Sequence, residues 1–396
     1  MISNLESNIP QELLKELGRA GGRLWIGIPR EIRRGEQRLA LTPEAVEILV
    51  MAGHKVWVET DAGLGISYSD NHYSEAGAEI VSSSAEVYQA DIILKILPPT
   101  LQEVAMMKPR TTLFSFVQPR LISQEILAMM SAKRINAVAY ELLKDNRQKS
   151  PVLNIISEIE GTAAITVAAD LLSNTHGGKG ILLGGIPGVS PTEVVIVGAG
   201  HAGTVAARAA LALGASVKVF DNDINNLRTI QTVLGHGLFT SNFHPHVLHN
   251  ALCTADVVIG AMRYIDSAKH YVVAEELISR MKRGSLIIDL RISQGGCFET
   301  TCDLPADAPE VFEQYGVLHY CRPNISNQVA RTASMALSNV FVPLFLELGD
   351  YSSIQNCAKS DDGFKSGIYM YAGKLVNDYV ASFFNLRANN IDIFML

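Results

Sequence analysis

Short apolar runs alternate with segments of helical periodicity along most of the chain. The runs are long enough for buried strands and too short to span a membrane, and Val194–Val197 is the most strand-like. Helical patterns separate them, as at Pro43–Ala52, which ends before Gly53. This alternation predicts an α/β protein with parallel sheets. We expect further strands at Leu24–Ile28, Lys55–Glu59, Ile92–Ile96, Leu113–Val117, Ile181–Ile186, Ser216–Phe220, Asp256–Ile259, Ser285–Leu290 and Val317–Tyr320.

Four other segments have helical periodicity. Residues 1–20 carry leucines at helical spacing, and an Ala-, Ile- and Thr-rich helix over Ile155–Leu172 is long enough to connect two domains. The chain after Asn324 is expected to be helical to about Leu348, and a last helix is expected over Ile368–Phe384.

Composition narrows the class of protein. The 396 residues are enough for two or three domains, and 48% of them are hydrophobic. A net charge of −7 argues against a nucleic-acid surface. The five cysteines are odd in number and the first residues lack a signal-peptide pattern, so we expect reduced thiols, a cytoplasmic location and no membrane segment. Cys297 and Cys302 have no second pair at zinc spacing, so we expect no metal site.

The strongest chemical signal is a glycine-rich turn after Val194–Val197. Gly198, Gly200 and Gly203 form GxGxxG around Ala199, His201 and Ala202, followed by an alanine-rich helix. The first glycine permits a tight turn, the second lets the backbone approach a pyrophosphate, and the third lets helix and strand pack closely. The helix N-terminus favours the phosphates. This context predicts a dinucleotide-binding Rossmann domain from roughly Ser157 to Asn324.

The residue that ends the next strand indicates which dinucleotide binds. Asp221 stands 23 residues after Gly198, where a carboxylate accepts hydrogen bonds from the adenosine ribose. It would repel the additional phosphate of NADP, although Arg228, seven residues on, could approach. We therefore expect NAD. His201 lies in the loop that faces the phosphates, so we expect a cofactor-loop residue and not a catalytic one.

Three segments together resemble a known family. IGIPREIRRGEQRLALTP near the start resembles the alanine dehydrogenase and transhydrogenase superfamily, and GGKGILLGGIPGV and DLRISQGGCFE resemble alanine dehydrogenase itself. The resemblance implies two Rossmann-like domains with parallel sheets flanked by helices: a discontinuous substrate domain of residues 24–150 plus 330–396, an NAD domain of residues 151–329, and an N-terminal extension of residues 1–23. It also implies oxidation of L-alanine to pyruvate and ammonia by a homo-oligomer, usually a hexamer.

Matching this chain to the family's motifs implies roles for three residues. Arg38, in GEQRLALTP, matches the arginine that binds the substrate carboxylate, which a guanidinium fork suits. Asn324 matches an asparagine near the substrate and nicotinamide, although Ile325-Ser326 replaces the usual MP after it. Ser157 matches a serine near the cofactor.

Three positions depart from the family pattern. Leu97 stands where the second lysine of LKVKEP binds the substrate, Gln118 where FLH supplies the general acid/base histidine, and Ser293 where an acid precedes QGG. Glutamine cannot transfer a proton in that role. Lys95 lies two residues before Leu97, on the same face of the strand, and could partly substitute, or could instead be a lysine at a strand end that reaches water.

Three functions therefore stay open. The first is an NAD-dependent amino-acid dehydrogenase with altered catalytic groups, acting on a small amino acid or 2-oxo acid. The second is an NAD(H)-binding or regulatory protein of the same fold with impaired chemistry. The third is a transhydrogenase-like component, which would not need the missing lysine and histidine but would work with a membrane partner.

Overall fold

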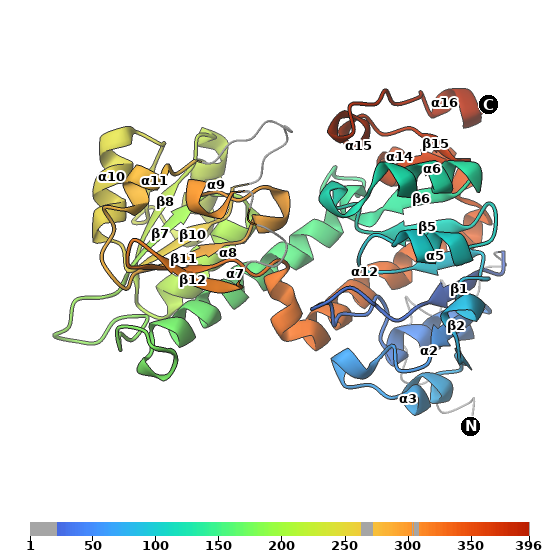
Figure 1. Cartoon of the computed structure of the whole chain (residues 1–396), viewed down its shortest axis with the longest axis horizontal. Helices are drawn as coiled ribbons and strands as arrows, with labels where there is room; N and C mark the ends of the chain where they lie inside the picture. Colours follow the sequence, from blue (N-terminus) through green and yellow to red (C-terminus); the bar gives the residue numbers. More distant parts are fainter. Residues whose placement is uncertain (1–21, 263–271, 303, 305–308, 396) are drawn as a thin grey trace. The chain divides into compact units, whose positions relative to one another are not determined.

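The computed structural model describes residues 22–262, 272–302, 304 and 309–395, and the helix expected over residues 1–20 lies outside them (Figure 1). The chain divides into two compact units. Unit 1 comprises Met1–Ile155 together with Val329–Leu396, and unit 2 comprises Ile156–Gln328. Each unit has its own sheet and its own apolar core.

Unit 1 contains an eight-stranded sheet in the order β15-β14-β6-β5-β4-β1-β2-β3. Strands β1 to β6 pair in parallel, as the alternating pattern predicts. The strands are β1 (Trp25–Ile28), β2 (Lys55–Glu59), β3 (Glu79–Val81), β4 (Ile92–Leu94), β5 (Thr112–Ser115), β6 (Asn136–Ala139), β14 (Ile368–Tyr371) and β15 (Lys374–Leu375). The helices are α2 (Pro43–Met51), α3 (Asp70–Glu75), α4 (Ser84–Val87), α5 (Leu101–Met106), α6 (Gln124–Ala132), α12 (Ala330–Tyr351), α13 (Ile354–Ser360), α14 (Asp362–Gly367), α15 (Asp378–Phe383) and α16 (Asp392–Met395).

The last helix expected from the sequence, over Ile368–Phe384, is wrong for most of its length. The structure has a hairpin there, in which β14 pairs antiparallel with both β15 and β6, and helix begins only at Asp378. All four residues of β14 are buried. Ala372 and Gly373 between the strands both have positive φ, as a tight hairpin turn requires. A run of four apolar residues suits a buried strand as well as a helix, and periodicity cannot separate the two.

Unit 2 contains a seven-stranded sheet in the order β12-β13-β11-β10-β7-β8-β9, parallel except for the β12–β13 pair. The strands are β7 (Glu193–Val197), β8 (Ser216–Phe220), β9 (Phe239–Ser241), β10 (Val257–Gly260), β11 (Leu286–Asp289), β12 (Val311–Gln314) and β13 (Val317–Tyr320). The helices are α7 (Pro151–Leu172), which begins in unit 1, and α8 (His201–Ala212), α9 (Ile224–Leu234), α10 (Pro245–Thr254) and α11 (Glu275–Ile278). The sheets confirm the predicted α/β class, with antiparallel strands added at their edges.

The strand expected at Ile181–Ile186 is also wrong. This segment is a loop in which Ile186 forms an isolated antiparallel bridge with Val189. Leu182, Ile186 and Val189 are more than half exposed, in contrast to the buried strands. The glycines at 184 and 188 have positive φ, and this left-handed backbone interrupts an extended run.

Two helical segments, Pro151–Leu172 and Ile325–Tyr351, are long and apolar enough to cross a membrane by length and composition. Half of the apolar window of each is buried inside the structure, and core helices pass the same test. Their composition is therefore weak evidence for a membrane span.

Strand order reverses once near the centre of each sheet. In unit 1 the chain builds outwards from β1 through β2 to β3, then returns to the other side of β1 with β4. In unit 2 the same reversal separates β7 from β10. Ligands of open α/β sheets bind outside the carboxyl ends of the strands at such a reversal. The loops after β1, β4, β7 and β10 are therefore the first places to search for a site.

Candidate active site and cofactor-binding loop

The glycine-rich loop follows β7 at the strand-order reversal of unit 2. Gly198 has a φ of +112°, and a Cβ there would lie 2.7 Å from backbone atoms of Ala261 and Met262, after β10. A Cβ on Gly203 would lie 1.9 Å from the carbonyl oxygen of Gly198. Around Gly200, by contrast, a Cβ would meet no described atom within 4 Å. Two glycines thus permit tight packing and the third leaves the backbone open to a ligand, as a dinucleotide loop requires.

The carboxylate of Asp221, which directly follows β8, shapes the same loop. It is buried and accepts hydrogen bonds from the N–H of Ala199, at 2.7 Å, and of Asp223, at 2.8 Å. One carboxylate therefore holds the glycine loop after β7 and the turn into α9 together. Arg228 lies exposed on α9.

One turn of α7 packs against the start of α8, where Ala202 and His201 lie. A Cβ on Gly161 would lie 2.5 Å from the carbonyl oxygen of Ala202, so the two helices approach closely. Glu158 pairs with the exposed His201 at 3.1 Å. Ser157, half-buried, lies on this turn of α7. The structure thus brings Ser157 and the glycine loop into the same region of unit 2.

Ser293 lies on a loop that begins at Asp289, the last residue of β11. The buried carboxylate of Asp289 accepts hydrogen bonds from the N–H groups of Cys297 and Arg291 and from the hydroxyl of Thr301. Burial raises the pKa of Asp289 despite these hydrogen bonds. The loop that carries the half-buried Ser293 is therefore held by hydrogen bonds to Asp289, an acid that the sequence analysis did not identify as part of the site.

Asn324 follows β13, the strand beside β11. Its φ of +54° is in the left-handed region, which is uncommon for a residue with a side chain. Its carbonyl oxygen accepts a hydrogen bond from the N–H of Asn327, at 2.8 Å. Asn324 and Ser293 thus lie on loops that follow neighbouring parallel strands.

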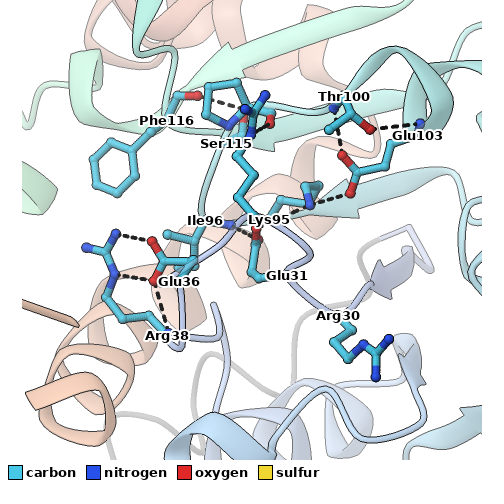
Figure 2. A network of polar contacts seen from close by, with 12 residues as sticks. Arg30, Glu31, Glu36, Arg38, Lys95, Ile96, Thr100, Glu103, Ser115 and Phe116 are labelled. Carbon is cyan, nitrogen blue, oxygen red and sulfur yellow. Dashed lines mark hydrogen bonds and ion pairs between the residues drawn. The ribbon is translucent and has the colours of Figure 1, made fainter. Parts of the chain in front are cut away.

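Arg38 lies on the loop after β1 and is held by an acid two residues earlier (Figure 2). Its Nε and Nη2 donate to the two carboxylate oxygens of Glu36 at 2.8 and 2.6 Å, and both side chains are almost completely buried. The guanidinium carbon lies 5.9 Å from the ring centre of Phe116. The N–H of the next residue, Leu39, donates a hydrogen bond to the hydroxyl of Ser334 in α12. The position of the arginine side chain is therefore fixed by contacts within unit 1.

Lys95 lies at the centre of a second buried network, beside β4 (Figure 2). Its Nζ is 2.7 Å from Glu103 Oε1 and 3.3 Å from Glu31 Oε2, and the lysine side chain is 1% exposed. The hydroxyl of Tyr88 donates to the same oxygen of Glu103. Burial alone would lower the pKa of Lys95, but the two carboxylates outweigh it and the pKa is raised. Lys95 therefore stays an ammonium ion, with carboxylates on both sides.

Leu97 and Gln118 follow the neighbouring strands β4 and β5. Leu97 is buried, and Gln118 is half-buried directly before Pro119. The guanidinium of Arg33 connects both loops, because it donates to the carbonyl oxygens of Pro98 and Leu121 at 3.1 Å each. Neither Leu97 nor Gln118 can supply a group that titrates near neutral pH.

Sequence reasoning missed the acids Glu31, Glu36 and Glu103. Two local signals were available. Glu36 lies two residues before Arg38, and Thr100 with Glu103 forms a capping box at the start of α5. No local pattern links Glu31 to Lys95, since 64 residues separate them.

Replacing Lys95 with Met should lower the free energy of unfolding by about 3–5 kcal/mol, because two carboxylates then lose their buried counter-charge. Lys365→Met is the matched control. That lysine also lies between two carboxylates, Asp362 and Asp392, but both are largely exposed, so the expected cost is below about 1 kcal/mol. Denaturant unfolding of the two variants tests the difference. Equal costs would show that the Lys95 network does not support the fold.

The chain matches two family models along most of its length. Residues 27–160 match the alanine dehydrogenase/PNT N-terminal domain, and residues 164–378 match the alanine dehydrogenase/PNT C-terminal domain. Alanine dehydrogenase 2 of Staphylococcus aureus strain Mu50 is 36% identical over 93% of this chain and 98% of its own length, as is that of strain N315.

Two solved structures have a similar fold. A structure of L-alanine dehydrogenase is 33% identical, with a TM-score of 0.83 over 91% of this chain and 99% of its own. Transhydrogenase from Sinorhizobium meliloti is 24% identical, with a TM-score of 0.74 over 89% of this chain and 98% of its own, and this likeness concerns the fold alone.

Proposed function

The chain belongs to the alanine dehydrogenase/PNT family, and on that premise we propose that it is an NAD-dependent oxidoreductase of L-alanine or a related small amino acid. The reaction converts L-alanine, NAD and water to pyruvate, ammonia and NADH. The glycine loop at the strand-order reversal of unit 2 carries this proposal, because its three glycines meet the steric requirements of a dinucleotide site.

The residues of unit 2 would hold NAD, which when bound supplies the acceptor for the substrate's hydride. Gly198, Gly200 and Gly203 would let the backbone and the start of α8 face the pyrophosphate, beside Ala202 and His201. Asp221 would accept hydrogen bonds from the adenosine ribose. Ser157, Ser293 and Asn324 would line the nicotinamide side, and Arg228 stays a candidate near the ribose.

The residues of unit 1 would bind and orient the amino acid. Arg38, held by Glu36, would pair with the substrate carboxylate. Lys95 is best assigned a positioning role, since its ammonium is engaged by Glu31 and Glu103 and its raised pKa makes it a poor base. Gln118 could hydrogen-bond a substrate or water but could not exchange a proton with it.

The second candidate function is an NAD(H)-binding or regulatory protein that does little chemistry. The observation that favours it is the combination of Leu97 and Gln118 with the engaged Lys95. Deamination needs a base that activates water and transfers protons, and none of these three side chains can act in that way. A transhydrogenase-like role is the third candidate, supported by the shared family alone. A cytoplasmic location for all three stays a proposal.

NADH should bind more tightly than NADPH, because the carboxylate of Asp221 repels a 2′-phosphate. Asp221→Asn keeps an oxygen that can accept from Ala199 while it removes the charge, so the preference should fall about tenfold, the effect of roughly 1.4 kcal/mol. Titration of both nucleotides by fluorescence measures this. Asp170→Asn, an exposed acid on α7, is the control that should leave the preference unchanged. Wild-type protein that binds NADPH as well as NADH would contradict the assignment.

Alanine oxidation should be slower than in a typical family member by at least about 10²-fold, the lower bound for losing one general acid–base group. The triple variant Leu97→Lys, Gln118→His, Ser293→Asp should raise turnover. Leu97→Met with Gln118→Asn adds no titratable group and is the matched control, with no gain expected. The measurement is the initial rate of NADH formation by the wild type, the triple variant and the control. Wild-type turnover at ordinary dehydrogenase rates, about 1–10³ s⁻¹, would show that other groups carry the chemistry.

We also propose a homo-oligomer, with a hexamer as the family resemblance implies. The loop with Leu182, Ile186 and Val189 exposes three large apolar side chains, which is typical of an interface. The helix over Ser334–Leu348 is a weaker candidate than its composition implies, because most of its apolar side chains are buried within unit 1. Ile186→Arg should lower the mass measured by light scattering, whereas Arg in place of the exposed Ile224 on α9 should not. A monomeric wild type at micromolar concentration would rule the oligomer out.

A further inference from the structure

The carboxyl group of Glu31 connects the two buried networks of unit 1 (Figure 2). Its Oε2 lies 3.3 Å from Nζ of Lys95, and its Oε1 accepts a hydrogen bond from the N–H of Ile96 at 2.6 Å. The side chain is 4% exposed. Glu36, which holds Arg38, acts on Glu31 as a further negative charge. Glu31 is therefore in contact with one network and within electrostatic range of the other.

The Lys95 network contains more carboxylates than cations. One ammonium faces two acids, Glu31 and Glu103, so full ionisation of all three groups leaves one negative charge without a partner in the network. All three side chains are at most 4% exposed, so solvent compensates this charge poorly. Binding of a proton to one of the two acids removes the charge. The network therefore favours a form in which one carboxyl is protonated.

Of the two acids, Glu31 has the weaker set of hydrogen bonds. Glu103 accepts hydrogen bonds from Lys95 at 2.7 Å and from the hydroxyl of Tyr88 at 2.6 Å, and it also accepts the N–H of Thr100 at 2.6 Å. Glu31 accepts one backbone N–H and has the longer contact with Lys95. Hydrogen bonds to the charged form favour ionisation. Burial raises the pKa of Glu31, whereas for Glu103 the charge of Lys95 and the hydrogen bonds outweigh burial and the pKa is lowered.

Packed side chains connect Glu31 with Arg38, the residue proposed to bind the substrate carboxylate. The guanidinium carbon of Arg38 lies 5.9 Å from the ring centre of Phe116, and that ring packs edge-on against Tyr140, with 4.7 Å between the ring centres. The hydroxyl of Tyr140 donates to the carbonyl oxygen of Ile96 at 2.8 Å, and the N–H of Ile96 donates to Glu31. A carboxylate bound at Arg38 would therefore add a negative charge to the surroundings of Glu31. Salt screens charges among buried groups only weakly.

We propose that Glu31 is the proton-exchanging group of the substrate site, which takes up a proton from solvent when a carboxylate ligand binds at Arg38 and returns it when the ligand leaves. The inference rests on the proposed role of Arg38. The added negative charge favours the neutral acid, so ligand affinity is highest at low pH and falls as the pH rises through the pKa of Glu31. The titratable groups in electrostatic range of Glu31 are Lys95, Glu36, Glu103, Tyr88 and Tyr140.

The test is isothermal titration calorimetry of the full-length protein with pyruvate, with NADH at saturation and ammonia absent. Titrations at one pH in buffers of different ionisation enthalpy give the number of protons bound with each pyruvate, because the buffer supplies them. If the ligand raises the pKa of Glu31 by one unit, uptake reaches about half a proton midway between the free and bound pKa values, and affinity falls about tenfold across the range. Glu31→Gln should bind pyruvate with both effects lost.

Two further variants test whether the effect belongs to Glu31. Glu125→Gln removes an exposed carboxylate on α6 of the same unit and should keep the proton uptake of the wild type. Thermal unfolding at neutral pH requires no ligand. Glu31→Gln should lower the melting temperature clearly less than Glu103→Gln, because glutamine resembles the neutral acid that burial favours at position 31 but not at position 103.

The possible outcomes separate this inference from the proposed function. Pyruvate binding without proton uptake would overturn the role of Glu31 and leave the assignment of Arg38 intact. Uptake that persists in Glu31→Gln would assign the proton to another group. Equal losses of melting temperature in the Glu31 and Glu103 variants would show that Glu31 is a fixed ion-pair partner of Lys95. A wild type that binds no pyruvate would contradict the proposed function, and with it the coupling.

Discussion

A single buried ammonium connects the loops around the strand-order reversal of unit 1. Lys95 follows β4, Glu31 follows β1 and Glu103 lies in α5, and each acid also accepts a backbone N–H, from Ile96 and Thr100 respectively. These contacts hold the loops that follow β1 and β4 at a fixed separation. A hydrophobic contact would stabilise the loops but leave their relative orientation free. An ion pair whose carboxylates also accept backbone N–H groups stabilises the loops and fixes their orientation as well. Arg38 lies seven residues after Glu31, between β1 and α2.

In unit 2 the loops at the strand ends are also held in position, here by carboxylates that accept hydrogen bonds from backbone N–H groups. Asp221 holds the glycine loop, and Asp289 holds the loop of Ser293, each by accepting two N–H groups. A loop near a ligand cannot bury large apolar side chains without filling the site. Buried acids at the strand ends stabilise such loops from the side of the sheet, and the face towards the ligand stays open, as it does around Gly200.

The parts of the site that the sequence predicted are those with local causes. The glycine loop follows from steric limits within six residues, and Asp221 from its distance along one strand–helix–strand unit. The environment of Lys95 was not predictable, because its partners lie 8 and 64 residues away. The hairpin of β14 and β15 was missed for a similar reason: β14 is a strand because β6, more than 200 residues earlier, pairs with it. The exposure of Ile186 was missed because apolarity indicates burial and cannot distinguish a core from a contact surface.

Two of the three positions predicted to depart from the family pattern are separate from the networks that hold these loops. Leu97 and Ser293 contribute no side chain to the Lys95, Glu36, Asp221 or Asp289 hydrogen bonds described above, and the backbone of Pro98, not the side chain of Leu97, contacts Arg33. The buried Leu97 is compatible with an intact ion-pair network around Lys95, two residues before it. The fold and the cofactor loop are weaker evidence for alanine turnover than for nucleotide binding, since binding depends on backbone geometry and turnover depends on a few side chains.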